Sequence, residues 1–352
     1  MSQKTSFWDI LDTSILKQDP RHSKNVSMYP SEASAVVTDA DGDQLVIGGC
    51  KRKSWFRNKS QRVLRDKPYQ TELFEEIKAS EFTANDLWKF KLSSGVERDL
   101  HHEAKRAGVY YDESHKFEWI IPSEHDEEIL VRGEVDLVIY QEPDSTDKVG
   151  IEVKSITGYY GQRLVFGKKS TKGHWIQKPE PKADNLLQAV LYTLVFCTLL
   201  RQFTAFKLVY ISRENGERNE FDITLVPEIQ DDESFKHRVY IDGKKYKYTL
   251  YAEDIMDSYK LVQDHVIADT LPPRDYALQY STEHLQMLAD KDLLTKKQKE
   301  KFEASGSLEK GDWQCSYCQF RDLCYDEEKN PIEYSFDEET STEEFLVTKD
   351  LF

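Results

Sequence analysis

The spacing of apolar residues along the chain predicts helices first and strands next. The first 47 residues are only weakly periodic, with a turn at Asp41–Asp43. Between residues 70 and 107 apolar positions recur every three or four residues, as on one face of a helix: Leu73, Phe74, Ile77, Val96, Leu100, Ala104 and Ala107. Three strand-like blocks then follow, at 117–121, 129–140 and 149–156.

The second half of the chain mixes both periods. The predicted elements are an apolar helix at 186–200, a buried strand at 206–212, a hairpin or meander from 221–226 and 238–250, a helix at 253–268 and a charged, solvated helix at 285–304. Strands that are followed by a helix and another strand indicate a mixed α/β core. No internal repeat is evident.

Two neighbouring strand blocks carry ionisable residues at alternating positions. In residues 132–139 apolar side chains alternate with acidic ones, so Asp136 faces away from the predicted core. In residues 149–155 the same alternation places Glu152 and Lys154 together on one face. Because only a short turn joins the two blocks, Asp136, Glu152 and Lys154 are expected to lie close together.

This group of side chains has a specific chemistry. Paired carboxylates supply the oxygen ligands that Mg²⁺ or Mn²⁺ prefers. A lysine beside such an ion can orient or deprotonate a water molecule and can stabilise charge developing on a phosphate. The group therefore indicates hydrolysis of phosphodiester bonds. The structural alternative is an amphipathic strand whose charged residues are simply solvated.

The apolar helix that follows carries Gln188 and Tyr192, four residues apart and therefore on one face. The order of Asp136, Glu152-X-Lys154 and Gln188-X-X-X-Tyr192 resembles the PD-(D/E)XK nucleases, in particular their RecB-like branch. The resemblance implies a restriction-endonuclease-like α/β core, in which helices flank a mixed central sheet.

Roles for these residues follow from the chemistry and the resemblance together. Asp136 and Glu152 would hold Mg²⁺ or Mn²⁺, with the Val153 carbonyl as a further ligand. Lys154 would position the attacking water and stabilise the transition state. Gln188 would orient Lys154 or the scissile phosphate, and Tyr192 would contact the nucleic-acid strand.

The cysteines give a second, separate signal. Cys315, Cys318 and Cys324 follow a Cys-X₂-Cys-X₅-Cys spacing, and three thiolates need a fourth ligand to complete a zinc or iron–sulfur site. Cys197 lies on the apolar helix, where a buried inert thiol is expected, so Cys50 is the preferred fourth ligand. This arrangement resembles the iron–sulfur RecB-like nucleases, which include CRISPR-adaptation nucleases, AddB-type helicase–nucleases and phage relatives.

That resemblance covers the chain from about Cys50 to Cys324. It implies that Cys50, Cys315, Cys318 and Cys324 hold a [4Fe–4S] cluster, which would join the N- and C-terminal segments of one domain. Zinc is the alternative occupant. RecB-like nucleases often add a histidine ligand from a helix ahead of the first carboxylate strand, and His102 is the candidate here, with Asp99 and Glu103 as alternatives.

Charge is unevenly distributed. The chain holds 48 basic and 64 acidic residues, a formal net charge of −16, which by itself argues against a nucleic-acid binder. However, the last 27 residues contain ten acidic residues and two lysines. Basic strips occur at 51–67 and 157–182, next to the predicted site. The residues expected to contact DNA are Lys51, Arg52, Lys53, Trp55, Arg57, Tyr159, Tyr160, Lys168 and Lys169.

These observations predict a metal-dependent deoxyribonuclease, and the resemblance implies an exonuclease on single-stranded DNA ends. The alternative is a non-catalytic DNA-binding or scaffold protein that keeps the fold and the cluster. The expected organisation is an N-terminal segment (1–49), a nuclease domain (50–325) and an acidic, disordered tail (326–352) that docks a protein partner or screens the basic strips. Because no signal peptide or membrane-length apolar segment is visible, a cytoplasmic location is expected.

Overall fold

The computed structural model describes residues 26–66, 72, 77, 84–122, 128–290 and 294–325, and its centre is a seven-stranded sheet. The strand order is β11-β10-β9-β8-β5-β4-β3. Strands β5 and β8 are parallel and the other neighbours are antiparallel, so the sheet is mixed. The strands are β3 (Tyr110–Ile121), β4 (Ile129–Tyr140), β5 (Lys148–Ile156), β8 (Ala205–Ser212), β9 (Arg218–Ile229), β10 (Phe235–Ile241) and β11 (Lys244–Lys245).

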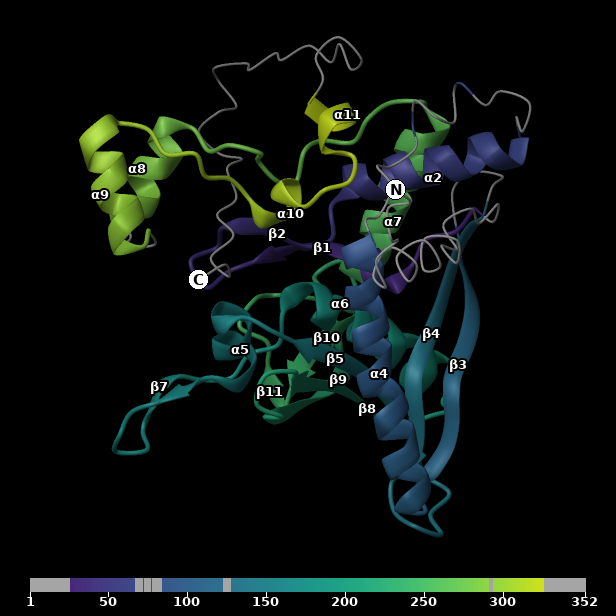
Figure 1. Cartoon of the computed structure of the whole chain (residues 1–352). Coiled ribbons are helices and arrows are strands. Elements are labelled where there is room, and N and C mark those ends of the chain that lie inside the picture. The colour runs from purple at the N-terminus through teal and green to yellow at the C-terminus, as the bar shows by residue number, and fades with distance from the viewer. Residues whose placement is uncertain are drawn as a thin grey trace, which may run out of the picture.

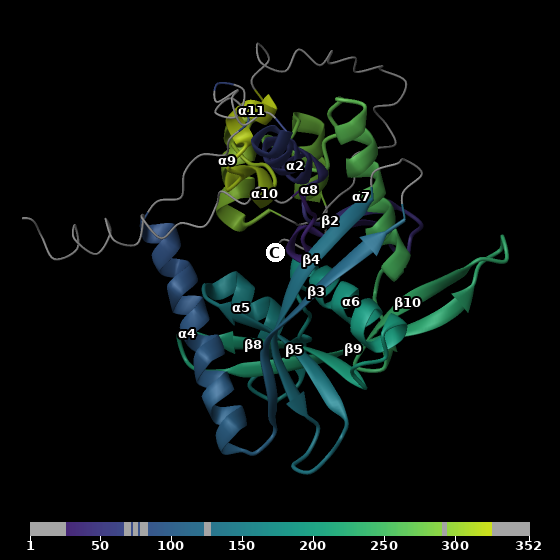
Figure 2. The same cartoon turned by 90° about the vertical axis from the view of Figure 1, so that its right-hand side faces the viewer.

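Strand β5 lies inside the sheet, between β8 and β4, and has buried side chains on both faces. Val149, Ile151 and Val153 pack against helix α4 (Ala84–Arg106) on one side. Glu152 points to the opposite face and is buried there, and its register partner on the neighbouring strand β8 is Leu208. Figure 2 shows α4 standing along one side of the sheet. The alternation predicted for this strand is therefore real, but its polar face is enclosed rather than solvated.

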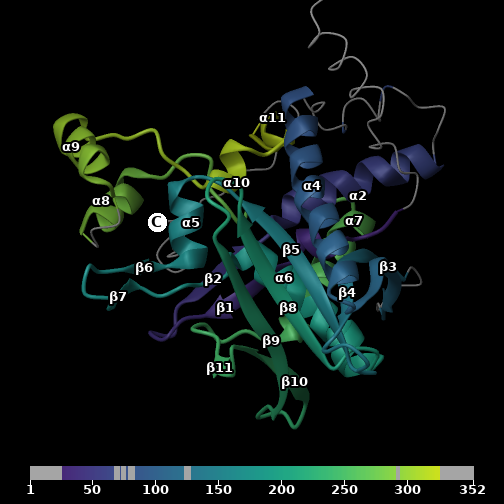
Figure 3. The same cartoon turned by 60° about the horizontal axis from the view of Figure 1, so that its bottom comes forward.

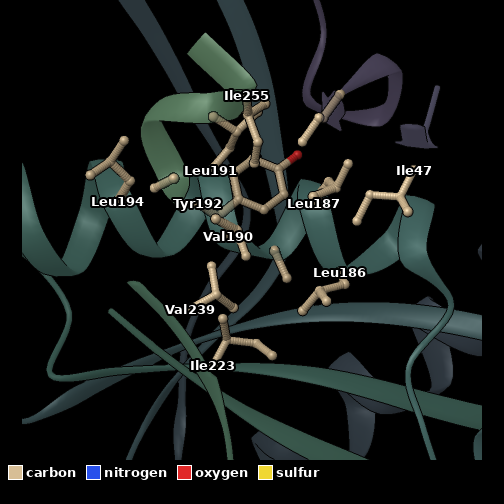
Figure 4. Packing of buried hydrophobic residues seen from close by; sticks show 14 of the residues in the cluster. Ile47, Leu186, Leu187, Val190, Leu191, Tyr192, Leu194, Ile223, Val239 and Ile255 are labelled. Atoms are coloured by element: carbon tan, nitrogen blue, oxygen red, sulfur yellow. The ribbon is translucent and has the colours of Figure 1, made fainter. Parts of the chain in front are cut away.

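The second face of the sheet is covered by helix α6 (Ala183–Tyr192), which continues as the π-helix η2 (Thr193–Leu199). This pair is the apolar helix predicted at 186–200. Leu186, Leu187, Val190 and Leu191 are fully buried between the sheet and neighbouring elements, and Figure 4 shows them with Ile223 and Val239 of the sheet. Burial of apolar area of this kind is the main stabilising contribution to a core.

The hairpin of β1 (Ser34–Thr38) and β2 (Gln44–Gly48) packs into the same core. Its turn lies where the sequence predicts one, and Gly42 there has φ of +90°, a conformation that favours glycine. Ala35, Val37 and Ile47 join the core cluster, together with helix α7 (Ala252–Ile267). Residues of this hairpin thus share one hydrophobic core with the central sheet and its helices.

The remaining elements surround this core. They are η1 (Pro30–Glu32), α2 (Lys51–Asp66), α5 (Tyr159–Phe166), β6 (Lys168–Lys169), β7 (Trp175–Gln177), α8 (Thr282–Asp290), α9 (Lys296–Ser305), α10 (Trp313–Ser316) and α11 (Arg321–Tyr325). The helix predicted at 285–304 is in fact two helices, α8 and α9, which form a small lobe with its own apolar cluster (Figure 1). Thr295 caps the second helix by accepting a hydrogen bond from the Gln298 N–H.

In the part of the chain that the structure describes, no helix is both long enough and apolar enough to cross a membrane. The acidic segment 326–352, with the partner-docking and screening roles predicted for it, lies outside the described residues, as do residues 1–25.

Candidate active site

Asp136 lies on β4 where that strand parts from β5. The pairing of the two strands runs from Tyr140↔Lys148 to Leu137↔Ile151. One residue further on, the Asp136 carboxylate accepts a hydrogen bond from the Val153 N–H at 2.7 Å. The side chain thus takes the place of a backbone acceptor. Burial raises the pKa of Asp136 to about 6, although Lys154 opposes this shift.

Glu152 is the most deeply buried carboxylate of the group, with 1% of its surface exposed. Its Oε1 accepts a hydrogen bond from Lys154 Nζ at 2.6 Å, whereas its Oε2 is buried without a hydrogen-bond partner. Burial raises the pKa of Glu152 to about 8. For Lys154, burial lowers the pKa, but the carboxylates of Glu152 and Asp136 outweigh it and the net shift is upward.

An unpartnered buried carboxylate oxygen requires an explanation, because a buried polar atom without a partner is destabilising by about 1–3 kcal/mol. A divalent cation between Asp136 and Glu152 would satisfy it, and two carboxylates are suitable ligands for Mg²⁺ or Mn²⁺. The two residues present therefore fit such an ion. Among the described residues, no group of three or more His, Cys, Asp or Glu side chains is arranged to hold a metal ion as it stands.

Gln188 and Tyr192 lie on one face of α6, as their spacing predicts, and Tyr192 contacts β4. The Tyr192 hydroxyl donates a hydrogen bond to the Glu134 carbonyl at 2.9 Å, and Gln188 Nε2 donates to that hydroxyl at 3.3 Å. Tyr192 is only 2% exposed, and its ring packs edge-on against Phe117. Tyr192 therefore positions β4 at Glu134, two residues before Asp136. Because its side chain is buried, it cannot make the contact with a nucleic-acid strand that the sequence predicts.

Helix α4 presents a different histidine from the one expected. His101 Nε2 lies 2.8 Å from the Asp136 backbone oxygen, whereas His102 is exposed on the outer side of the helix. Asp99 and Glu103, the alternatives, are exposed as well. Glu97, one turn before His101, acts electrostatically on both Asp136 and Glu152. The helix-borne candidates are therefore His101 and Glu97.

All four cysteines assigned to a cluster line one cavity, which is formed by α2, α10, α11 and the segment 274–276. Cys50 precedes α2, and the other three come from the C-terminal part of the described chain. Burial raises the pKa of Cys315 to about 12, with neighbouring thiols adding to the shift. Cys197 lies elsewhere, in η2 against the core. The fifth cysteine is thus separated from the other four, and its side chain is partly rather than fully buried.

The cavity is also lined by cationic side chains. Arg52 Nη1 lies 3.6 Å from Cys324 Sγ, and Arg52 Nε donates to the Pro272 carbonyl at 2.7 Å. Lys53, Arg274 and Arg321 contribute further positive charge. Four thiols with guanidinium donors around them are a donor set whose chemistry suits an anionic thiolate cluster. Among the described residues, however, the thiols are not drawn together as a ready ligand group.

The basic strip predicted at 51–67 is not a continuous exposed surface. Lys51 is 5% exposed and pairs with Asp275, Arg52 is 7% exposed, and Trp55 is 8% exposed. Arg57 forms an ion pair with Glu32. Of the five residues expected here to contact DNA, only Lys53 is exposed. Lys51, Arg52 and Arg57 are turned inward because Asp275, Glu32 and backbone carbonyls supply partners from other parts of the chain. Trp55 is buried in the hydrophobic core.

The second basic strip is exposed, as predicted. Tyr159 and Tyr160 are 62% and 61% exposed, and Lys168 and Lys169 lie on an exposed strand. These four residues follow β5 directly in the chain, within fifteen positions of Lys154.

No protein-family model matches the chain, and no curated protein matches it. Among the solved structures that match is one described as "Crystal structure of SSO0001", which aligns with 91% of this chain and 98% of its own at 12% sequence identity and a TM-score of 0.39. A likeness at this level says nothing about function.

Proposed function

We propose that the chain is a divalent-metal-dependent deoxyribonuclease of the PD-(D/E)XK type. The observation that carries the proposal is the meeting of Asp136, Glu152 and Lys154 where β4 parts from β5. Two partly or fully buried carboxylates lie there beside one lysine, and one carboxylate oxygen has no hydrogen-bond partner. A purely structural ion pair would need neither the second carboxylate nor the unpartnered oxygen.

Each side chain has a defined task in this proposal. Asp136, fixed by the Val153 N–H, and Glu152 bind Mg²⁺ or Mn²⁺, with the Val153 carbonyl as the third protein ligand. When bound, the ion supplies Lewis-acid polarisation of the phosphate and lowers the pKa of water. Lys154 holds the attacking water in line with the phosphorus atom and stabilises the negative charge of the transition state.

The surrounding residues support this group. Gln188 and Tyr192 hold β4, so they act as positioning residues for Asp136. From α4, His101 forms a hydrogen bond with the backbone oxygen of Asp136. Glu97 adds negative charge that favours a cation. This assignment places one supporting helix on each face of the sheet, in keeping with a restriction-endonuclease-like core.

A [4Fe–4S] cluster held by Cys50, Cys315, Cys318 and Cys324 belongs to the same proposal. The four thiols line one cavity, and a cluster there would join the start of α2 to the C-terminal segment. Zinc is the competing occupant, and iron and zinc analysis of anaerobically purified protein separates the two.

The proposed substrate is DNA, cleaved by an exonuclease action from single-stranded ends. Exposed Lys53, Tyr159, Tyr160, Lys168 and Lys169 are the proposed contacts to its backbone and bases. This substrate follows from the resemblance, since the chemistry of the site specifies only a phosphodiester.

The test is product analysis on DNA. Single-stranded and double-stranded oligonucleotides, labelled at the 5′ or the 3′ end, are incubated with the protein and Mg²⁺, Mn²⁺ or EDTA. The proposal expects cleavage with either ion, none with EDTA, and stepwise shortening of one labelled single strand. Absence of cleavage under every condition with metal-loaded protein would overturn it and leave a DNA-binding or scaffold role.

A further inference from the structure

Residues 157–179, called the basic arm below, form one continuous module after β5. The module comprises α5, β6, β7 and their connections, and its β6–β7 hairpin projects from the body of the molecule next to α5 (Figure 1, Figure 3). It contains five lysine or arginine residues and no aspartate or glutamate, in a chain whose net charge is −16. A local excess of this sign attracts polyanions.

The basic arm is fixed to the molecule by several contacts. Val165 is fully buried in the main core, and its carbonyl accepts a hydrogen bond from Asn219 Nδ2 at 2.7 Å. Arg163 Nε donates to Gln177 Oε1 at 2.7 Å and thereby ties α5 to β7. The Glu180 N–H donates to the Leu164 carbonyl at 2.9 Å. Because α5 and the hairpin are joined in this way, the arm presents its outer side chains in a defined arrangement.

Three aromatic side chains on this module are exposed. Tyr159 and Tyr160 begin α5, with 62% and 61% of their surfaces exposed, and Trp175 on β7 is 44% exposed. Lys169 Nζ lies 4.4 Å from the centre of the Trp175 ring, and Arg163 Nη1 lies 3.3 Å from the Tyr159 hydroxyl. Exposed aromatic rings beside cations are the combination that binds unpaired bases and phosphates together.

The arm follows the proposed catalytic group directly along the chain. Tyr159 is five residues after Lys154, and the intervening Gly158 N–H donates to Glu214 Oε1 at 2.7 Å, which holds this connection against the end of β8. Gly158 itself has φ of +80°, a conformation suited to glycine that allows the sharp change of direction from strand to helix.

We infer that the basic arm is the element that selects single-stranded over double-stranded nucleic acid. Its cations bind phosphates of either form, but Tyr159, Tyr160 and Trp175 need bases whose faces are not already stacked in a duplex. The inference rests on the proposed function for the presence of nucleic acid at this site. It adds Trp175 to the recognition surface and predicts that binding is independent of the metal ion.

A second exposed hairpin provides the matched control. Phe235, the first residue of β10, is 65% exposed and so resembles Trp175 in exposure, but Asp231, Asp232 and Glu233 precede it in the β9–β10 turn. Figure 2 shows this hairpin extending beyond the sheet. Negative charge there repels a polyanion, so exposure of an aromatic ring alone does not predict binding.

The experiment measures binding with fluorescently labelled oligonucleotides in EDTA, where no cleavage occurs. The full-length variants are Tyr159→Ala/Tyr160→Ala, Trp175→Ala, Lys168→Gln/Lys169→Gln and the control Phe235→Ala. Probes are 15-nucleotide single-stranded DNA, the same sequence as RNA, and the DNA duplex. Because all substituted side chains are exposed, circular dichroism and Tm of each variant should match the wild type.

The expected result is a loss of about tenfold or more in affinity for single strands in each aromatic variant, with duplex binding and the control unchanged. The lysine variant should bind both single strands and duplex more weakly. For single strands it should also reduce the slope of log affinity against log salt concentration by about 1.4. Comparison of the DNA and RNA probes identifies which is preferred. Equal losses for single strand and duplex, or wild-type binding in all arm variants, would overturn the inference.

These outcomes are separable from those of the nuclease assay. Cleavage of DNA with normal preference by the arm variants would refute the selecting role while leaving the proposed function intact. Metal-independent binding through the arm, without cleavage by wild-type protein under any condition, would retain the arm and refute the nuclease.

Discussion

Lys154 Nζ lies 2.6 Å from Glu152 Oε1, while the second oxygen of that carboxylate is buried without a hydrogen-bond partner. The ion pair therefore satisfies only half of Glu152. In a protein built for stability alone, a buried pair with one unsatisfied oxygen is a weak solution, since an apolar pair of similar volume would often be as stable or more stable. The arrangement is better explained by an occupant that the pair is built to receive.

Replacement of Glu152 by glutamine should stabilise the metal-free protein at alkaline pH. The pKa of Glu152 is raised by burial to about 8, so between pH 4.5 and 8 the folded state binds a proton that the unfolded state has lost. The free energy of unfolding of the wild type therefore falls as pH rises through this window. Glu152→Gln removes that dependence, and urea unfolding in EDTA at pH 5.5, 7 and 8.5 measures the widening difference.

Divalent metal should reverse the order of the two proteins. At pH 8, a saturating concentration of Mn²⁺ satisfies the Glu152 carboxylate and raises the Tm of the wild type, because a ligand that binds only the folded state stabilises it. Glu152→Gln should show little or no rise, and EDTA should abolish the rise in the wild type. An equal rise in Tm with Mn²⁺ in both proteins would mean that the ion binds at a site without Glu152.

Neighbouring histidines on α4 give a matched pair of variants. His101→Ala removes the contact to the Asp136 backbone and should reduce the rate of cleavage at limiting Mn²⁺ by about 10- to 100-fold, as expected for a group that orients a metal-binding carboxylate. His102→Ala, one residue further along and exposed, should leave the rate unchanged. Steady-state rates across a Mn²⁺ titration measure both. Greater sensitivity to His102→Ala would restore the sequence-based assignment.

Two cysteines test the proposed cluster. Cys324→Ala removes a thiol that lines the shared cavity and accepts a contact from Arg52, so anaerobically purified protein should lose most of its bound iron and visible absorbance. Cys197→Ala removes a thiol of η2 that packs against the apolar core, and its iron content should equal that of the wild type. Colourless wild-type protein with stoichiometric zinc would favour the zinc alternative.

Local patterns predicted most of the strands and the approach of Asp136, Glu152 and Lys154 to one another. Apolar and polar residues alternate around Asp136 and Glu152, which is the two-residue period of a strand, and β4 has the bounds that this pattern predicts. The spacing of Gln188 and Tyr192 likewise placed both on one helix face. Short-range periodicity can determine which side chains share a face, and this was sufficient to bring the carboxylates and the lysine together.

Long-range partners were not predictable in the same way. Lys51 and Arg52 read as exposed cations because the sequence does not show that Asp275 and the Pro272 carbonyl, more than 200 residues away, will face them. The choice between His101 and His102 depends on rotation of α4 about its axis, and the apolar stripe of that helix has polar residues along both margins. The π-helix after Tyr192 also leaves no periodic signature in a uniformly apolar run.

The central claim is tested most directly by comparing two lysine variants in single-turnover cleavage of end-labelled single-stranded DNA. Lys154→Ala removes the lysine beside Glu152, whereas Lys207→Ala removes a lysine of β8 that is paired with Glu220 and Asp222 at the surface. With Mn²⁺, the account predicts a fall of about 10²–10⁴-fold for Lys154→Ala and a wild-type rate for Lys207→Ala. A wild-type cleavage rate in folded Lys154→Ala would contradict it.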